Sequence, residues 1–215
     1  MKKLYLLRHG QTEFNVKKLV QGRCDSPLTD LGRKQAGMAA AWLKGHDVVP
    51  DKVVSSPLGR AMDTAQLVAC ELLGSDAAVE PCEGIIEPCE GIIERSYGTF
   101  EEGPHDALPT DVWDPGEDLV PFGGEGSRAL QERMVGTLTN LMGSEGIENL
   151  LAVSHGSASR QFIKAAAPEG FKLPAKLPNC AIMIFDFEEF KPQAEGEPPQ
   201  CKFTLQQIVD PQQSN

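Results

Sequence analysis

Two histidines in this sequence directly follow apolar segments, and the groups beside them could do chemistry. His9 comes after Leu4–Leu7 and Arg8, His155 comes after the mostly apolar segment 149–154, and a glycine follows each histidine. An imidazole can attack an electrophile or exchange a proton near neutral pH, and a guanidinium binds anions. One histidine after a strand is more often structural than catalytic, but two segments that end alike favour a shared site.

The two apolar segments predict buried β-strands. In open α/β sheets, ligands bind at the carboxyl ends of the strands. A third segment, Ser55–Ala61, leads into a helix expected over about 58–73 and puts Arg60 in its first turn. A cation there opposes the helix dipole, so this position does little for helix stability. Together with the amide groups of the helix N-terminus, Arg60 is instead well placed to bind an anion.

These three motifs carry a family resemblance. Arg8-His9-Gly10, the run Ser55-Ser56-Pro57-Leu58-Gly59-Arg60-Ala61 and Ser154-His155-Gly156 resemble, in that order, the histidine phosphatase superfamily, also called the phosphoglycerate mutase-like family. The late histidine is followed by glycine and not by aspartate, which resembles branch 1, the branch of mutases and small-molecule phosphatases. The resemblance spans about residues 3–187.

The resemblance implies phosphoryl transfer. Neutral His9 would attack phosphorus and form a phosphohistidine, while Arg8, Arg60 and His155 would hold the phosphoryl oxygens. Cations around His9 should keep it unprotonated. The sequence offers no set of ligands typical of a two-metal phosphatase, so we expect no metal and no cofactor.

A proton donor is expected near a perfect duplication. Glu80–Ile86 is repeated at once as Glu87–Ile93, and Glu94-Arg95-Ser96-Tyr97-Gly98 follows. The last run resembles the family segment that supplies the acid. We assign the general acid to Glu94, with Glu87 as the alternative if the duplication has shifted the register.

A polar loop after His9 is expected to hold the substrate. The segment 15–26 contains Gln21-Gly22-Arg23, whose backbone and guanidinium could reach a phosphate, although a solvated loop is an equally good interpretation of the residues alone. The resemblance implies that Asn15 and Arg23 grip the substrate. The other substrate-binding residues that we expect are Gln21, Gly22, Arg95, Gly156 and Ser157.

Residues 96–127 contain eight carboxylates and no Lys or Arg. Their Gly- and Pro-rich composition is typical of a lid or of a disordered segment. An acidic lid would repel phosphoglycerate, and Phe100, Trp113 and Phe122 could pack on an uncharged or aromatic leaving group. We therefore expect a metal-independent phosphomonoesterase that acts on small phosphorylated metabolites. A phosphoglycerate mutase is the alternative, and a non-catalytic binder of phosphorylated ligands is the third.

Strands alternate with helices along the chain, which predicts a three-layer α/β/α fold with a mostly parallel sheet and an antiparallel edge hairpin. We expect a single domain over 1–215 with an inserted lid over about 80–126. The expected strands are 4–7, 52–55, 149–154, 180–187 and 202–209. The expected helices run from an N-cap at Thr29 to about 44, and over 58–73, 127–142 and 157–167.

Composition narrows the possible partners. The net charge of −11 argues against non-specific binding to nucleic acid or anionic membranes. No apolar run approaches the roughly 20 residues that span a bilayer. The N-terminus lacks a signal-peptide pattern, and six scattered cysteines favour reduced thiols. We expect a cytoplasmic protein, and a homodimer is left open.

Overall fold

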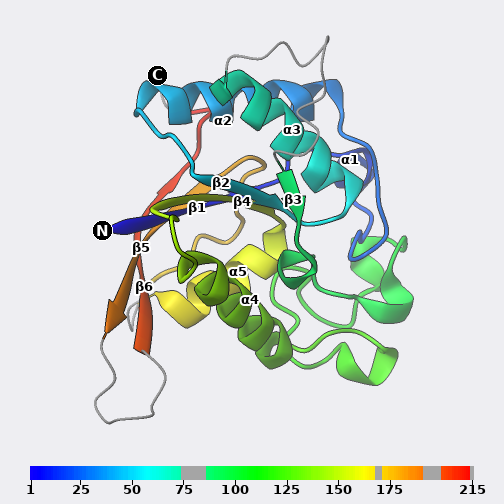
Figure 1. The fold of residues 1–215 in the computed structure, drawn as a ribbon. Coiled ribbons are helices and arrows are strands. Elements are labelled where there is room, and N and C mark those ends of the chain that lie inside the picture. The colour runs from blue at the N-terminus through cyan, green and yellow to red at the C-terminus, as the bar shows by residue number, and fades with distance from the viewer. Residues whose placement is uncertain (74–85, 168–170, 191–199, 214–215) are drawn as a thin grey trace.

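A six-stranded sheet is the centre of the computed structural model, which describes residues 1–73, 86–167, 171–190 and 200–213. The strand order is β3-β2-β4-β1-β5-β6 (Figure 1). The strands are β1 (Lys2–Arg8), β2 (Lys52–Ser55), β3 (Ile86–Pro88), β4 (Asn149–Ser154), β5 (Ile182–Phe190) and β6 (Gln200–Val209).

The sheet is parallel from β3 to β1 and antiparallel at the other edge. β1 pairs in parallel with β4, in a register that sets Arg8 beside Ser154. β1 also pairs antiparallel with β5, and β5 pairs antiparallel with β6. The expected mostly parallel sheet with an antiparallel edge hairpin is therefore confirmed.

Helices cover both faces of the sheet (Figure 1). Helices α2 (Asp30–Gly45) and α3 (Gly59–Leu73) pack on one face, and α4 (Ser127–Met142) and α5 (Gly156–Ala166) pack on the other. In β1, Leu4 and Leu6 enter the core under α4 and α5, whereas Tyr5 and Leu7 enter the core under α2 and α3. A strand that is buried on both faces has to be apolar at every position, which explains the continuous run.

Most element boundaries follow the local signals. Thr29 caps α2 by accepting a hydrogen bond from the Gly32 amide, and α4 ends at Gly143. The helix α1 (Glu13–Lys17) was not expected in the polar loop. It is held by a capping box between Thr12 and Asn15, and at five residues it is too short to show a periodicity.

The insertion is ordered around a small core of its own. Val20, Tyr97, Leu108 and Leu119 form this cluster, and four 3₁₀ turns lie between residues 90 and 122. Phe100 and Phe122 pack on each other, with ring centroids 5.0 Å apart. Neither ring lines the site described below, so the expectation that both could pack on a leaving group is wrong.

The second copy of the duplication is described, whereas residues 80–85 of the first copy lie outside the described residues. Glu87 lies in β3 with its side chain exposed, and it forms an ion pair with Lys52 at 2.7 Å. Cys24, Cys89 and Cys180 are free thiols, but Cys70 is disulfide-bonded. The expectation of reduced thiols throughout is therefore wrong at Cys70.

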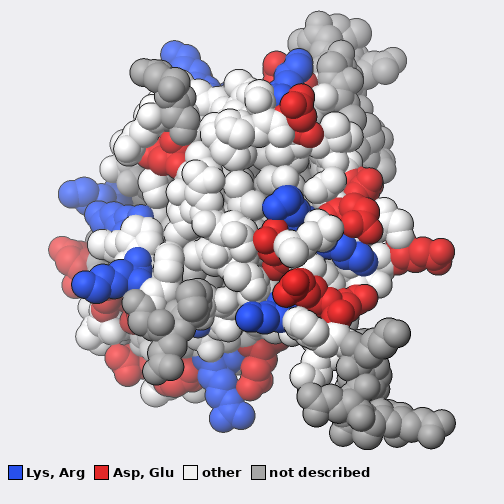
Figure 2. All heavy atoms as spheres, turned by 90° about the vertical axis from the view of Figure 1, so that its left-hand side faces the viewer, with Lys and Arg blue, Asp and Glu red and all other residues white. Residues whose placement is uncertain are grey.

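Charged side chains of both signs intermingle on the face shown in Figure 2, and neither sign forms a continuous patch there. Within the described residues, no helix is long and apolar enough to cross a bilayer.

Candidate active site

The two histidines meet at the carboxyl ends of adjacent strands. Because β1 and β4 are in register, His9 and His155 leave the sheet side by side, and the His9 amide donates to the Ser154 carbonyl at 3.0 Å. The ring centroids are 5.2 Å apart in an edge-on arrangement. Both side chains are buried. The predicted pairing of the two histidine segments is thus present in the structure.

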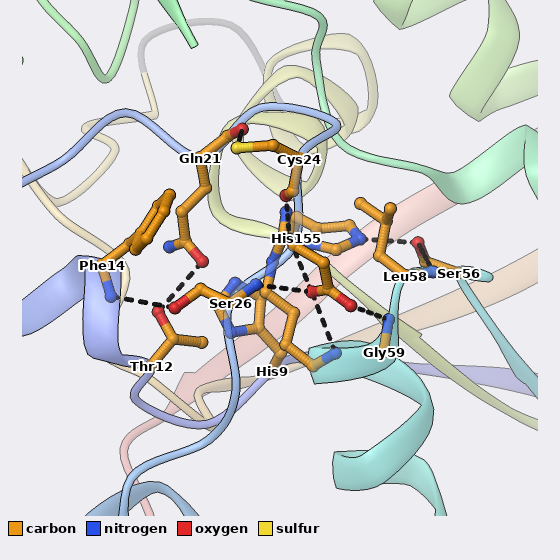
Figure 3. Close-up of polar contacts among 12 residues, drawn as sticks. His9, Thr12, Phe14, Gln21, Cys24, Ser26, Ser56, Leu58, Gly59 and His155 are labelled. Atoms are coloured by element: carbon orange, nitrogen blue, oxygen red, sulfur yellow. Dashed lines mark hydrogen bonds and ion pairs between the residues drawn. The ribbon is translucent and has the colours of Figure 1, made fainter. Parts of the chain in front are cut away.

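Hydrogen bonds hold the two rings through opposite nitrogens. His9 Nδ1 lies 2.7 Å from the Gly10 carbonyl, which can only accept, so Nδ1 carries the proton and Nε2 keeps its lone pair. His155 Nε2 lies 2.6 Å from Ser56 Oγ (Figure 3). Ser56 Oγ accepts from the Leu58 amide at 3.4 Å and keeps a proton to donate to His155. In that arrangement His155 Nδ1 is an N–H donor, and it has no partner among the described residues.

Two buried arginines flank the histidines. Arg60, at the start of α3, donates to the carbonyls of Cys24 and Gly22 at 2.7 and 2.8 Å and forms an ion pair with Asp25 at 3.2 Å. Arg8, at the end of β1, donates from Nη1 to the Leu177 carbonyl. The Nε atom of each arginine is buried without a partner in the described part of the chain. Unpaired buried donors are costly, so they mark a place that an anion can fill.

The arginines and burial keep both imidazoles neutral. Burial, followed by Arg60 and Arg8, holds the pKa of His9 well below its usual 6.5. Burial and Arg60 do the same to the pKa of His155. Burial also lowers the pKa of Arg8 to about 10, against the opposing charge of Glu94. At neutral pH the site therefore has two guanidinium ions and two uncharged rings.

Glu94 lies at the N-terminus of α5. Its carboxylate accepts hydrogen bonds from the amides of Arg95, Ser157 and Ala158 at 2.8, 3.1 and 2.8 Å. These three donors fix the orientation of a carboxylate that also lines the cavity. Glu87 does not line it, so the structure places the first-choice glutamate, and not the alternative, at the site.

These groups line one cavity with about 470 Å³ of empty space, part of which is open to solvent. Apolar and aromatic groups of the insertion and of the loop after β1 line the rest of it. The lining residues are Arg8, His9, Asn15, Leu19, Val20, Gln21, Gly22, Arg60, Glu94, Tyr97, His105, Val112, Trp113, Gly156 and Ser157. The His155 ring lies 5.2 Å from that of His9, edge-on, and His155 is not among the residues that line the cavity.

Five of the seven expected substrate-binding residues reach the cavity, namely Asn15, Gln21, Gly22, Gly156 and Ser157. Arg23 does not; its side chain is about half exposed and forms an ion pair with Glu125 at 3.7 Å. In this arrangement Arg23 is not brought into the cavity, and its grip on the substrate stays a prediction.

Arg95 also does not line the cavity and instead forms hydrogen bonds within the protein. It is fully buried, and its guanidinium donates to Ser157 Oγ at 2.9 Å, to Ser127 Oγ at 2.8 Å and to the carbonyls of Gly116 and Glu125 at 3.2 and 2.6 Å. These bonds join the insertion to α4 and α5. Since its donors are occupied, the expectation that Arg95 binds substrate is wrong.

Several residues that contact the site groups or line the cavity were not predicted from the sequence. Asp25 accepts from the amides of Gly59 and Arg60 at 2.6 and 3.3 Å, so a carboxylate caps α3 beside the arginine. Asn179 donates to the His9 carbonyl at 3.1 Å and to Asn15 Oδ1 at 3.2 Å. His105 lines the cavity, and one of its ring nitrogens lies 3.2 Å from the Leu19 carbonyl. Isolated Asp, Asn and His residues in loops carry no sequence signal of such roles.

The comparisons with known proteins agree with the geometry. A probable phosphoglycerate mutase, GpmB, from Cronobacter sakazakii is 31% identical over 205 residues, covering 91% of this chain and 90% of the relative. A phosphoserine phosphatase from Entamoeba histolytica, solved in complex with phosphoserine, is 26% identical with a TM-score of 0.69, covering 99% of this chain and 98% of that one. A mycobacterial glucosyl-3-phosphoglycerate phosphatase in complex with VO3 has a similar fold, with a TM-score of 0.74 at 24% identity over 96% and 98% of the two chains.

A family model described as the histidine phosphatase superfamily (branch 1) matches residues 4–196. The matched range contains both histidines, both arginines and the glutamate of the cavity. On this match, and on the buried anion site that the same residues build, the chain belongs to branch 1 of the histidine phosphatase superfamily.

Proposed function

We propose that this protein hydrolyses small phosphomonoesters through a phosphohistidine at His9, without a metal ion. One observation carries the proposal: Arg8 Nε, Arg60 Nε and His155 Nδ1 have no partner among the described residues, and these three side chains lie near an imidazole that is held through Nδ1. A tetrahedral oxyanion between them would satisfy buried donors that otherwise have no partner in the described structure.

In the first step, His9 Nε2 attacks phosphorus and the bond from phosphorus to the ester oxygen breaks. Glu94, in its protonated form, gives a proton to the departing alkoxide. In the second step, Glu94 takes a proton from water, the resulting hydroxide attacks phosphorus, and the bond from phosphorus to His9 Nε2 breaks. Orthophosphate leaves, and both side chains return to their starting states.

The positive groups stabilise the charge that develops on the equatorial oxygens. Arg8 and Arg60 supply two full charges in a buried site, where each interaction is stronger than in water. His155 adds a directed hydrogen bond. These groups are positioned to do what a metal ion does in other phosphatases, and we therefore propose that the reaction needs none.

The cavity has two ends. The phosphate end consists of Arg8, His9 and Arg60, with the His155 ring next to that of His9, and the leaving-group end consists of Tyr97, His105, Val112 and Trp113. None of the eight carboxylates of residues 96–127, all of which are described, lines the cavity. Five are exposed, and the other three, Glu101, Asp114 and Glu125, are hydrogen-bonded to protein groups. Direct repulsion between an acidic lid and phosphoglycerate is therefore weak evidence for a substrate with an uncharged leaving group. The apolar and aromatic side chains at the leaving-group end are better evidence for such a substrate.

A phosphoglycerate mutase remains the second candidate, on two observations. The relative from Cronobacter sakazakii is named a probable mutase. In addition, burial lowers the pKa of His105, the charges of Lys176 and Lys18 lower it further, and the Leu19 carbonyl and Asp106 oppose the shift, so two lysines and one carboxylate lie near His105 at the leaving-group end. Such cations could attract the carboxylate of a phosphoglycerate.

A substrate panel separates the two candidates. Phosphomonoesters should be assayed for phosphate release in EDTA, beside isomerisation of 3-phosphoglycerate with and without 2,3-bisphosphoglycerate. We expect hydrolysis of neutral-alcohol and aromatic phosphates to be fastest and to survive EDTA. Faster isomerisation of 3-phosphoglycerate than hydrolysis of any ester would favour the mutase, and activity restored only by added metal would refute metal independence.

We further propose that the substrate is a small metabolite and that the protein acts in the cytoplasm. The free thiols of Cys24, Cys89 and Cys180 support this compartment, whereas the disulfide at Cys70 is an exception to it. Cell fractionation tests the proposal.

A further inference from the structure

We propose that Trp113, in the insertion, is a positioning residue that holds the Arg8 guanidinium in the anion site. The inference rests on the proposed function only in that Arg8 is taken to bind the phosphoryl group. It extends that function by making the insertion part of the anion site as well as a wall for the leaving group.

The two arginines are held in different ways. Arg60 has three polar partners for its guanidinium, the carbonyls of Cys24 and Gly22 and the carboxylate of Asp25. Arg8 has one hydrogen bond, to the Leu177 carbonyl, among the described residues, although its guanidinium carries five N–H donors. A single hydrogen bond leaves the plane of a guanidinium free to rotate, so packing has to orient Arg8.

Trp113 supplies this packing. The Arg8 Cζ lies over the indole, 5.2 Å from the ring centroid, which is the geometry of a cation–π contact. Gly156 leaves room for the pair, since a Cβ at that position would lie 3.1 Å from Trp113 Cζ3 and 3.3 Å from Arg8 Nε. The indole and the Arg8 guanidinium therefore pack on each other and on the start of α5 at Gly156. The free Arg8 Nε is left for a ligand.

The insertion holds Trp113 in place from both sides. The Tyr97 hydroxyl donates to the Val112 carbonyl at 2.7 Å. On the other side, Asp114 accepts from Gln161 Nε2 at 2.9 Å and forms an ion pair with Lys164, both on α5. The same helix begins directly after His155. These contacts make the position of the indole, and through it that of Arg8, depend on the docking of the insertion on α5.

Binding of orthophosphate, measured by calorimetry on the full chain, tests the role without requiring turnover. Trp113→Leu keeps an apolar side chain but removes the aromatic face, and we expect about tenfold weaker binding. Trp113→Phe restores a ring and should bind within about threefold of the wild type. Phe122→Leu changes another aromatic residue of the insertion, outside the cavity, and should bind like the wild type.

Kinetics with methyl phosphate separate positioning from leaving-group contact, because a methyl group is too small to pack on an indole. We expect Trp113→Leu to raise KM and to lower kcat for methyl phosphate, and Trp113→Phe to restore both. If Trp113→Leu binds orthophosphate like the wild type and loses activity only toward bulky esters, the proposal is overturned. Trp113 is then only a wall of the cavity.

If Trp113→Leu fails to fold, Asp114→Asn loosens the indole without altering it. We expect this variant to bind orthophosphate about threefold more weakly, and unchanged binding would again overturn the proposal. A wild type that binds orthophosphate but hydrolyses no ester would refute the proposed function. The ratio of the orthophosphate binding constants of Trp113→Leu and the wild type would still decide the role of Trp113.

Discussion

The phosphate end and the leaving-group end of the cavity differ in the structure that carries them. At the phosphate end, His9 and His155 each follow a strand of the sheet directly, and Arg60 begins α3. At the leaving-group end, His105, Val112 and Trp113 lie in an insertion of 3₁₀ turns and loops, organised by a small separate core. Regular elements fix atoms accurately, whereas irregular segments tolerate substitution.

This difference suggests a division of labour. The chemistry depends on groups whose positions follow from strand register and from a helix N-terminus. Substrate choice depends on a segment whose sequence can change while the sheet is kept. The contact between Trp113 and Arg8 is the point where the two ends meet. A substitution at one end of the cavity, measured with suitable substrates, shows whether the other end is affected.

The largest effect is expected at the phosphate end. Replacing His9 by Ala removes the nucleophile, and we expect turnover of every ester to fall by at least about 10⁴-fold. A quenched reaction of the wild type should yield an acid-labile phosphoryl group that His9→Ala lacks. His46→Ala is a matched control, because His46 is exposed and stacks on Trp42. Full turnover in His9→Ala would rule out His9 as the nucleophile.

The second-largest loss of turnover is expected when Glu94, and not Glu87, is replaced. Glu94→Gln should lower turnover by roughly 10²–10⁴-fold, the usual range for a lost acid–base group. It should also lower the Tm, because the new amide nitrogen would face a backbone N–H at the start of α5. Glu87→Gln should leave both quantities close to wild type, since Glu87 is exposed at the sheet edge. The reverse ranking in turnover would remove Glu94 from the acid role.

A smaller effect is expected in the pH dependence of stability. The folded pKa of His155 is depressed below its usual 6.5, so the unfolded chain binds a proton first as the pH falls. Stability from this group is present above about pH 6.5 and is lost between that value and the folded pKa.

Removing the group should therefore flatten the pH dependence. In His155→Gln, the drop in the free energy of unfolding between pH 7 and pH 5 should be smaller than in the wild type, because the depressed pKa of the buried imidazole no longer contributes. Denaturant titrations at the two pH values measure it. An equal drop in both proteins would show that His155 becomes protonated in the folded site.

The smallest effect is expected at the rim of the leaving-group end. Replacing Lys18 and Lys176 together by Gln should lower kcat/KM for 3-phosphoglycerate by about threefold at low salt, with a smaller difference at high salt. Esters of neutral alcohols should be unaffected. Lys44→Gln is the control, because Lys44 is an exposed lysine paired with Glu71. A large loss with neutral esters would mean that these lysines act on the phosphate end.

The sequence predicted the phosphate end better than the leaving-group end. His9, His155 and Arg60 lie next to strands and a helix whose local signals are strong, so their meeting follows once the sheet is assumed. Arg95 and Arg23 show where this reasoning fails. Both were expected at the substrate, but Ser157, Ser127 and Glu125 occupy their guanidinium groups instead. A motif gives the type of a side chain and leaves its direction open.

The sequence by itself determined the order of the longer strands and helices, the placement of both histidines after apolar strands, and the branch of the family, but not the short elements α1 and β3. These properties depend on periodicity and on spacings of a few residues, which are local. Only the tertiary structure decided which ring nitrogen of each histidine is free, where the carboxylates of the insertion point, and that Trp113 covers Arg8. Those outcomes depend on partners far apart in the chain, such as Arg8 and Leu177 at a separation of 169 residues, and packing alone brings such partners together.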